Sequence, residues 1–466
     1  MSLRFSRRAA LAASAAAAMS RPARAARTAD PDVLVIGAGL SGLHAAQLLE
    51  EAGLRVKVIE ASARLGGRVR TLMDKPHTPE SGGSEVGPMY ARVLDQIQRF
   101  GLETRAWQAE KLEFALNVGG ALMSPKDWPN APQNKLSGAL RNLPPMALAS
   151  AFVPKDSGLA ELDSWLEEAS TLPDPSLYEL YTTKGADEAA VGLLARLAQA
   201  DDLKNESSLW GRRSQKLLEW SRGRGPFNHV VGGMSRVPMA MAASLKGDII
   251  LNSAVERITA DKNSARVKCT NGRSFKAKYV LCTVPASVLR GIAIEPGLPA
   301  LQAEAVASIP YGQATSVFFE IKDKFWEADG LGSSLWTDGA AGRAYNWFIP
   351  GGNYIWMYLA GRTNIPLRAA TDADVIAYAT AELHKARPST KDKVKPIAAM
   401  NWSANPWSRG TFAYRAPGQI AKYGNIAAAS HGNVHFAGEH TAVLQSGLEG
   451  AMESGERAAL EILGRV

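Results

Sequence analysis

The stretch that decides the fold is Val33-Leu34-Val35-Ile36-Gly37-Ala38-Gly39-Leu40-Ser41-Gly42. Its four leading apolar residues predict a buried parallel strand, and three glycines follow at G-x-G-x-x-G spacing. The apolar pattern after Leu40 predicts a helix, and the stretch Val56–Ile59 predicts a second strand that leads directly into Glu60. A strand, a glycine turn, a helix, a strand and an acid in this order form the dinucleotide-binding fingerprint.

Each part of the fingerprint has a physical role. Gly37 permits the tight turn, Gly39 lets a pyrophosphate approach the backbone, and Gly42 lets the helix pack closely on the strand. The N-terminus of the helix offers unpaired N–H groups to phosphate oxygens. Glu60 can accept hydrogen bonds from a ribose hydroxyl. The complete pattern therefore predicts a bound dinucleotide and not merely a tight turn.

The composition is that of a globular protein with a large core. The chain has 466 residues, of which 46% are hydrophobic and 21% are charged, and this length predicts two or three domains. The formal charge of +8 is concentrated at the start of the chain, because residues 1–25 contain five arginines and no acid. The remaining 48 Lys and Arg residues face 45 Asp and Glu residues, which gives a charge of +3. We therefore expect no nucleic-acid-binding surface.

The first 25 residues have the pattern of an export signal. Ser6-Arg7-Arg8 is a twin-arginine arrangement, an alanine-rich segment follows to Met19, and Ala23-Arg24-Ala25 fits small-x-small cleavage. We expect a mature protein that begins near Ala26 and lies in the periplasm. A disordered basic tail is the alternative interpretation. No apolar run in the sequence is long enough for a transmembrane anchor.

Two further glycine pairs can bring bare backbone close to a ligand. Gly66-Gly67 lies between Arg64 and Arg68, just past the second predicted strand, and Gly82-Gly83-Ser84 forms a later loop. Arginines beside such a turn can place positive charge near a pyrophosphate.

The rest of the chain divides by pattern. Residues 101–224 are rich in helical patterns broken by prolines and predict an inserted helical region. Residues 310–415 contain β-rich runs with many aromatic side chains and predict an antiparallel sheet. The apolar runs that contain Cys269 and Cys282 predict strands, and we expect both cysteines to be buried free thiols, although a disulfide is possible in the periplasm.

In this order, the pieces resemble the FAD-dependent amine oxidase family, the flavin monoamine oxidases. The resemblance covers nearly all of the chain after the predicted signal. It rests on the fingerprint through Gly66-Gly67-Arg68 and on three C-terminal motifs, Phe436-Ala437-Gly438-Glu439, Glu449-Gly450-Ala451 and Ser454-Gly455. The segment 101–224 matches only weakly.

The resemblance implies an α/β fold with two interleaved domains. A noncontiguous Rossmann-like FAD-binding domain would consist of residues 30–100, 225–290 and 425–466. A substrate-binding domain of antiparallel sheet plus helices would consist of residues 101–224 and 291–424.

The resemblance also implies which residues hold the two ends of the FAD. Ser41, Glu60 and Arg68 would bind the adenosine and the pyrophosphate, and Val255 would meet the adenine through its backbone. The full set of implied cofactor residues is Gly37, Gly39, Leu40, Ser41, Gly42, Glu60, Ala61, Gly67, Arg68, Gly83, Ser84, Val255, Gly438, Glu439 and Leu448.

At the flavin end, Gly83 and Ser84 would lie along the isoalloxazine ring and Glu439 beside the ribityl chain. The helix that begins near Leu448 would point its N-terminus at the pyrimidine ring, where negative charge gathers on reduction.

Three residues would act at the substrate. Lys322 precedes Phe325-Trp326 at the spacing where the family has a lysine bonded through water to flavin N5. A positive charge there can assist oxygen reduction, and a solvated lysine is the alternative interpretation. Trp402 belongs to the stretch beside the flavin face, and Phe412 falls where the family has one wall of an aromatic cage for the amine.

Three positions depart from the family pattern. Thr411 stands where some members carry a cysteine bonded to the flavin, so noncovalent FAD is expected. The second cage wall is missing, because only Gly447 or Leu448 is available there, and we expect a wider substrate pocket. Glu85 replaces an aromatic residue of mammalian-type members, and it can either bind a cationic amine or serve as a structural acid hydrogen-bonded to backbone.

The predicted function is oxidation of an amine C–N bond by hydride transfer to flavin N5, giving an imine that hydrolyses. The kind of amine stays open among primary, cyclic secondary, polyamine and L-amino-acid substrates. Oxygen and a periplasmic carrier are both open as the electron acceptor, and so is a homodimeric state. The alternatives are a flavin-dependent C–C desaturase of the same fold and a non-catalytic periplasmic FAD-binding partner protein. No metal site is predicted.

Overall fold

The described part of the chain begins just after the predicted export signal. The computed structural model describes residues 30–107, 113–168, 171–198, 200–347 and 353–466. The signal assigned to residues 1–25 lies outside the described residues.

The fingerprint strand lies at the centre of a five-stranded parallel sheet of order β20-β13-β1-β2-β9. Its strands are β1 (Val33–Ile36), β2 (Val56–Ile59), β9 (Ile249–Ile250), β13 (Tyr279–Cys282) and β20 (Val434–Phe436). All four residues of β1 are buried, because both faces of the sheet are covered, and this explains its uninterrupted apolar sequence. The sheet therefore unites three distant parts of the chain.

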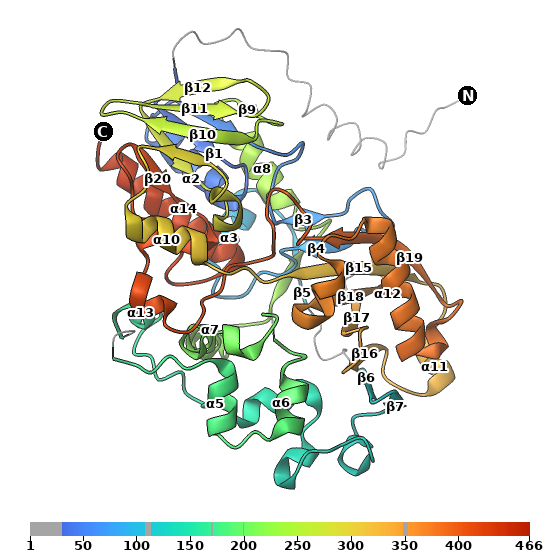
Figure 1. The fold of residues 1–466 in the computed structure, drawn as a ribbon. Helices are drawn as coiled ribbons and strands as arrows, with labels where there is room; N and C mark the ends of the chain where they lie inside the picture. The colour runs from blue at the N-terminus through green and yellow to red at the C-terminus, as the bar shows by residue number, and fades with distance from the viewer. Residues whose placement is uncertain (1–29, 108–112, 169–170, 199, 348–352) are drawn as a thin grey trace, which may run out of the picture.

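Helices cover one face of this sheet and a smaller sheet covers the other (Figure 1). The helical layer consists of α2 (Leu40–Glu51), α3 (Ala91–Arg99), α8 (Arg236–Ser244) and α14 (Gly447–Leu463). The smaller sheet has the order β12-β11-β10-β14 and contains β10 (Val255–Ala260), β11 (Ala265–Cys269), β12 (Ser274–Ala277) and β14 (Ala293–Glu295). Cys269 and Cys282 are both buried and free, as expected.

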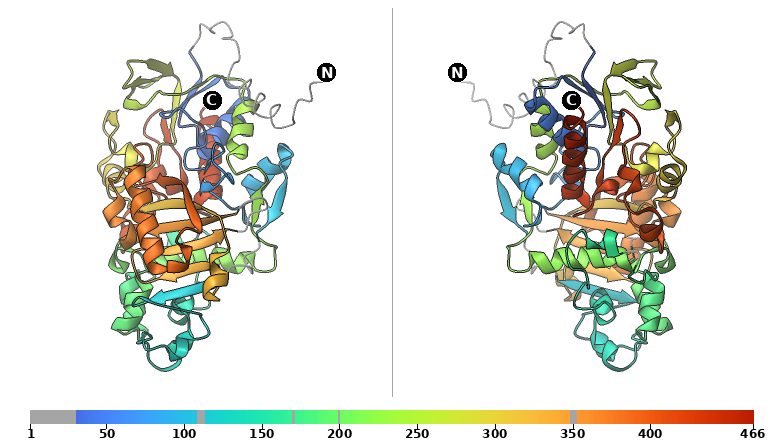
Figure 2. Two further views of the ribbon diagram at one scale, coloured as in Figure 1. Left: turned by 90° about the vertical axis from the view of Figure 1, so that its right-hand side faces the viewer. Right: turned by 90° about the vertical axis from the view of Figure 1, so that its left-hand side faces the viewer.

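The second part of the molecule is a seven-stranded sheet of order β19-β15-β18-β17-β16-β6-β7. Its strands are β6 (Phe114–Val118), β7 (Ala121–Met123), β15 (Ala314–Ile321), β16 (Ser334–Thr337), β17 (Arg343–Trp347), β18 (Tyr354–Ala360) and β19 (Val394–Asn401). Neighbouring strands are antiparallel except for the parallel pair β6 and β16. Helix α12 (Asp372–Ala386) covers one face, and the other face carries the aromatic side chains. In both views of Figure 2 this sheet lies below the parallel-sheet part.

Short elements join the two parts. The ribbon of β3 (Arg70–Thr71) and β4 (Glu80–Gly82) leaves the parallel-sheet part and packs on the aromatic face through Leu72. The remaining short strands and α-helices outside the segment 101–224, together with the strand pair β5 and β8, complete the fold. They are β5 (Thr104–Ala106), β8 (Asn228–Val230), α9 (Ala286–Leu289), α10 (Ala300–Ser308), α11 (Phe325–Asp329) and α13 (Gln419–Tyr423).

The segment 101–224 is only partly helical, in contrast to the prediction. It contains α4 (Ser164–Glu167), α5 (Leu177–Thr183), α6 (Glu188–Leu194) and α7 (Ser208–Ser221), but it also supplies β6 and β7 to the large sheet. The missed signal is Gly119-Gly120, which joins β6 to β7 with positive φ angles of 55° and 81°. A Gly-Gly pair between two short apolar runs is a β-hairpin signal.

Among the described residues, no helix combines the length and the apolar character needed to cross a membrane.

Candidate active site

A cavity of about 620 Å³ lies between the two parts of the molecule. It begins at the glycine turn after β1 and extends to the aromatic face of the seven-stranded sheet. We call the part lined by Gly37, Gly39, Leu40, Ser41, Glu60, Ala61 and Val255 the dinucleotide end. We call the part lined by Gly83, Ser84, Ser316, Trp356, Tyr358, Trp402, Phe412, Gly447 and Leu448 the ring end.

Backbone forms the dinucleotide end. A Cβ added at Gly42 would lie 2.0 Å from the carbonyl oxygen of Gly37, so only glycine allows this contact between helix and turn. No side chain caps the N-terminus of α2, where Gly39 is the N-cap residue. Its first N–H groups are therefore available to phosphate oxygens. The carboxylate of Glu60 accepts hydrogen bonds from the backbone N–H groups of Ala38 and Ser62, both at 2.8 Å.

Glu439 has one satisfied and one unsatisfied carboxylate oxygen. Its Oε1 accepts hydrogen bonds from Arg68 Nη1 at 2.7 Å and from the N–H of Ala413 at 3.0 Å. Its Oε2 is buried and receives no donor from the described residues. Burial alone would lower the pKa of Arg68, but the charge of Glu439 outweighs burial and raises that pKa, so Arg68 stays a guanidinium. A buried carboxylate oxygen without a donor is unfavourable unless a ligand supplies one.

Backbone also approaches the ring end closely. A Cβ at Gly83 would lie 2.8 Å from Leu448 Cδ2, and one at Gly82 would lie 2.8 Å from Trp402 Cζ2. No side chain caps the N-terminus of α14, whose N-cap residue is Ser446, so its first N–H groups can face a ligand.

These features fit FAD. The two uncapped helix N-termini suit a pyrophosphate and an electron-rich ring edge. The free oxygen of Glu439 suits a hydroxyl of the ribityl chain, and the bare glycine backbone leaves room for a flat ring. Thr411 lines the cavity, and its hydroxyl donates to the carbonyl of Gly312 at 2.9 Å.

Most of the residues predicted from the sequence come together here. Fourteen of the fifteen cofactor residues line the cavity, and the fifteenth, Gly42, supports the turn beneath it. Trp402, Phe412 and Gly447 line the ring end, as expected. Lys322 and Glu85 are not among the lining residues.

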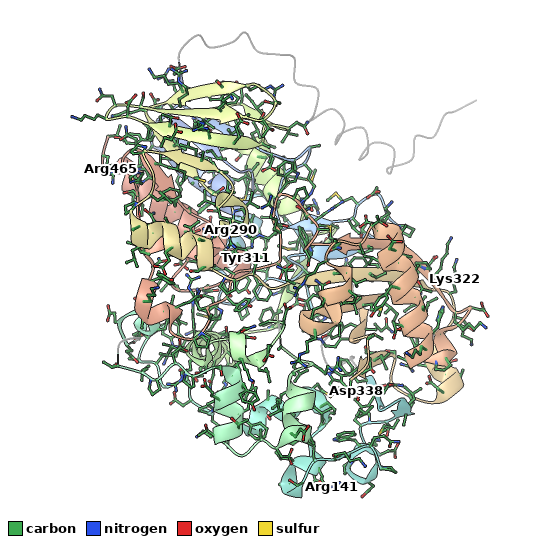
Figure 3. The ribbon with its side chains drawn as sticks, viewed as in Figure 1. Arg141, Arg290, Tyr311, Lys322, Asp338 and Arg465 are labelled. Carbon is green, nitrogen blue, oxygen red and sulfur yellow. The ribbon has the colours of Figure 1, made fainter. Side chains whose placement is uncertain are left out.

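The structure contradicts the role expected for Lys322. Its Nζ lies 3.1 Å from Glu320 Oε2 and its side chain is 49% exposed. Figure 3 shows it at the outer edge of the large sheet, far from Tyr311 at the junction of the two parts. The strand explains the error: Ser316 of β15 lines the cavity, and six residues of extended chain span about 20 Å. The solvated lysine was the correct interpretation.

Glu85 follows the ring-end residue Ser84. The carbonyl of Ser84 accepts a hydrogen bond from His229 Nδ1 at 2.8 Å, whereas no described residue gives the Glu85 carboxylate a hydrogen bond. Burial raises the pKa of Glu85 to about 7. The predicted alternative of an acid fixed by backbone donors therefore has no support among the described contacts.

Several ring-end residues were missed from the sequence. Trp356 and Tyr358 project from β18, and Ser316 projects from β15 beside them. Glu80 also lines the cavity, and burial raises its pKa to about 7 against the hydrogen bonds from Met234 N–H and Thr71 Oγ1. A polar residue such as Ser316 within an apolar strand was the available signal.

The residues between Glu439 and Gly447, here called the 440–446 loop, are fixed by the helical segment. Arg213 of α7 donates to the carbonyls of Val443 and Gln445. Its guanidinium lies 5.3 Å from the ring centroid of Trp165 and 4.5 Å from that of Trp210. The far side of the loop is held by Glu453, which accepts three backbone N–H groups. Residues remote in sequence thus fix the N-terminus of α14.

Fold and cavity together define a dinucleotide-dependent flavoprotein in which a substrate pocket meets the end of the cofactor site. The chain belongs to the flavin-containing amine oxidoreductase family, whose profile matches residues 40–463. The predicted family, the FAD cofactor and FAD-dependent oxidation of an amine are thereby confirmed.

Individual proteins agree with this assignment. The chain is 28% identical to an L-amino-acid oxidase of Siganus canaliculatus, over 92% of this chain and 85% of the relative. It is 28% identical to human amine oxidase [flavin-containing] B, over 93% and 86% of the two chains. Its fold is similar to that of cyclohexylamine oxidase from Brevibacterium oxydans IH-35A, with a TM-score of 0.77 and 23% identity over 94% and 99% of the chains. Putrescine oxidase bound to putrescine gives a TM-score of 0.75 at 22% identity over 93% and 99% of the chains. These structures confirm the predicted fold class.

Proposed function

We propose that this chain oxidises an amine that sits in the ring end between Trp402, Phe412 and the aromatic residues of β18. The observation that carries the proposal is the single cavity that joins the glycine turn to this aromatic-walled space. The bound FAD supplies the redox chemistry, taking two electrons from the carbon–nitrogen bond. FAD is noncovalent in this proposal because Thr411 cannot form a thioether.

The protein contributes orientation and exclusion of water. The indole Nε1 of Trp402 donates to the carbonyl of Ser81 at 2.7 Å, which fixes the ring beside the β3–β4 ribbon. Trp402 is 4% exposed, so its face offers a dry surface. Phe412 supplies a further aromatic side chain to this end of the cavity, and Gly447 adds no side chain there. A substrate held in this way reacts faster because its orientation is set in advance.

Glu85 directly follows the ring-end residue Ser84, although it does not itself line the cavity. Because burial raises its pKa to about 7, an ammonium ion that enters favours the ionised form of Glu85. In the proposal Glu85 attracts the cationic amine, and the amine gives its ammonium proton to solvent before oxidation. Oxygen is the proposed electron acceptor, consistent with the oxidases among the relatives.

The test is anaerobic reduction of the purified protein by amines. We expect a yellow protein whose visible flavin absorbance bleaches when an amine is added and returns when air is admitted. Bleaching by a saturated lipid-like substrate and not by amines would favour the C–C desaturase. Flavin that no substrate reduces would favour the non-catalytic binding protein.

The site of action is a separate part of the proposal. We propose export through the twin-arginine pathway to the periplasm, supported by Arg7-Arg8 and the alanine-rich segment that follows. Replacement of Arg7-Arg8 by two lysines should keep the protein in the cytoplasm, as fractionation of expressing cells would show. Size-exclusion chromatography of the mature protein tests for the homodimer.

A further inference from the structure

Arg70 is a cation of the cavity wall whose only side-chain acceptor among the described residues is a thioether. Arg70 lines the cavity and is half-buried as a residue. Its Nη1 donates to Met400 Sδ at 3.0 Å, and no described carboxylate lies within ion-pair distance. The acid nearest in sequence, Asp74, is 73% exposed and pairs with Lys75. A planar guanidinium has five donors and matches a carboxylate with two parallel hydrogen bonds.

A second donor lies beside Arg70. Ser316 of β15 is the register partner of Met400 of β19, and paired residues of neighbouring antiparallel strands are about 5 Å apart. The hydroxyl oxygen of Ser316 accepts a hydrogen bond from Trp356 Nε1 at 2.9 Å. Its own hydrogen has no acceptor among the described residues, and Ser316 lines the same cavity. Two donors from different elements therefore converge on one wall.

The position of this wall assigns the anion to the substrate and not to the cofactor. The N-terminus of α2 would hold the pyrophosphate of FAD, and the N-terminus of α14 beside Gly83 would face the electron-rich edge of the flavin ring. Arg70 instead contacts the seven-stranded sheet, whose β18 carries Trp356 and Tyr358. An anion held there lies among the residues of the substrate pocket.

We propose that Arg70 and Ser316 bind a carboxylate of the substrate, so that the amine oxidised is an amino acid. This inference rests on the proposed function, because it assumes that the ring end holds an amine. The carboxylate accepts from the guanidinium of Arg70 and from the hydroxyl of Ser316, and the aromatic walls receive the side chain.

Arg92, Arg236 and Arg343 are less suited to this role. Arg92 is paired with Glu449 and Glu456. Arg236 donates to the carbonyl of Val231. Arg343 lies over the ring of Tyr358, 5.3 Å from its centroid, but does not line the cavity. Arg343 is therefore the rival anchor that the experiment must separate from Arg70.

The test compares substrates that differ only in the carboxylate, L-phenylalanine with 2-phenylethylamine and L-tyrosine with tyramine, by anaerobic flavin reduction of the holoenzyme. We expect the wild type to favour each amino acid in kcat/KM by about 100-fold or more. Arg70→Met should lower kcat/KM for the amino acids by about 100-fold and leave the amines within about threefold. Arg70→Lys should fall between, because an ammonium lacks the planar fork. Arg224→Met, at an exposed arginine outside the cavity, is the matched control.

A binding measurement makes the test independent of turnover. Benzoate should perturb the visible spectrum of the oxidised holoenzyme, with a dissociation constant raised about 30-fold in Arg70→Met and about fivefold in Ser316→Ala. Flavin content equal to that of the wild type confirms that each variant is folded. If Arg70→Met does not fold, the dissociation constants of benzoate for the wild type and for Arg70→Lys are compared instead. Weaker binding to Arg70→Lys supports the carboxylate site, and equal binding overturns it.

The outcomes separate this inference from the proposed function. A wild type that oxidises the decarboxylated amines in preference, or binds no benzoate, overturns the carboxylate site and leaves amine oxidation standing. If Arg343→Met loses amino-acid oxidation and Arg70→Met does not, the carboxylate is bound by Arg343, and the assignment of this role to Arg70 is overturned. Flavin reduced by neither class of compound overturns the proposed function itself.

Discussion

The two ends of the cavity are built from different materials. The dinucleotide end consists mainly of backbone from one short stretch, the turn between β1 and α2, where Gly37 and Gly42 leave no room for a Cβ atom. The ring end consists mostly of side chains from β15, β18, the residues that follow β19 and the start of α14, together with glycine backbone just after β4. A site of backbone is fixed by local sequence, whereas a site of side chains depends on how distant strands align. Changes at the first end should therefore abolish cofactor binding, and changes at the second should tune chemistry.

The largest effect is expected at the glycine turn. In Gly42→Val, the added side chain meets the carbonyl oxygen of Gly37, since even a Cβ would lie 2.0 Å away. We expect loss of bound FAD, measured as the ratio of flavin to protein absorbance. Gly192→Ala is the matched control, because a Cβ there meets nothing within 4 Å. Full flavin content in Gly42→Val would refute the backbone description of this end.

A smaller but still large effect is expected where the two ends meet. Glu439→Gln removes the buried charge that balances the partly buried Arg68. Breaking a buried pair on one side costs about 3 kcal/mol of unfolding free energy, and FAD should bind about 100-fold more weakly. Denaturant unfolding and FAD titration measure the two effects. Glu295→Gln is the control, because Glu295 forms an exposed ion pair with Arg257. It should change neither the free energy of unfolding nor the affinity for FAD by a measurable amount.

Next to the ring end, the pH dependence of stability should report Glu85, which follows Ser84 in the chain. Burial raises the pKa of Glu85 to about 7 from an ordinary 4.5, so the folded state binds more protons than the unfolded state between these values. Stability therefore falls as the pH rises through this window. Glu85→Gln removes the charge, and we expect the variant to exceed the wild type by about 2 kcal/mol at pH 8 and to match it near pH 4.

Glu80, whose pKa is also about 7, remains in both proteins and contributes equally to their pH profiles. The melting temperatures of the wild type and of Glu85→Gln, measured from pH 4 to pH 8, make the comparison. If the melting temperature depends on pH in the same way in both proteins, Glu85 is solvated and does not have a raised pKa.

The smallest effect is expected at Lys322. Lys322→Met removes a half-exposed ion pair with Glu320, which is worth under about 1 kcal/mol. The rate at which oxygen reoxidises the reduced flavin should stay within about twofold of the wild type, by stopped-flow absorbance. A slowing of about 100-fold would restore the role predicted from the sequence.

The same contrast explains what the sequence could predict. The glycine turn, Glu60 and the C-terminal Gly438-Glu439 are local patterns with a fixed structural meaning, and all of them line the cavity. Lys322 was misplaced because a motif near Phe325-Trp326 does not say which residue of the preceding strand faces the cavity. Ser316, Trp356 and Arg70 become neighbours only through the register of β15 with β18 and β19 and the packing of the β3–β4 ribbon. The spacing of residues along the chain does not predict that these three residues become neighbours.

The clamped 440–446 loop has a consequence for biosynthesis. Its carbonyls are held by Arg213 from the middle of the chain, and its amides by Glu453 near the end. A ribosome has therefore released almost the whole polypeptide before the flavin pocket can close. We therefore expect FAD to bind only after translation of the chain is complete.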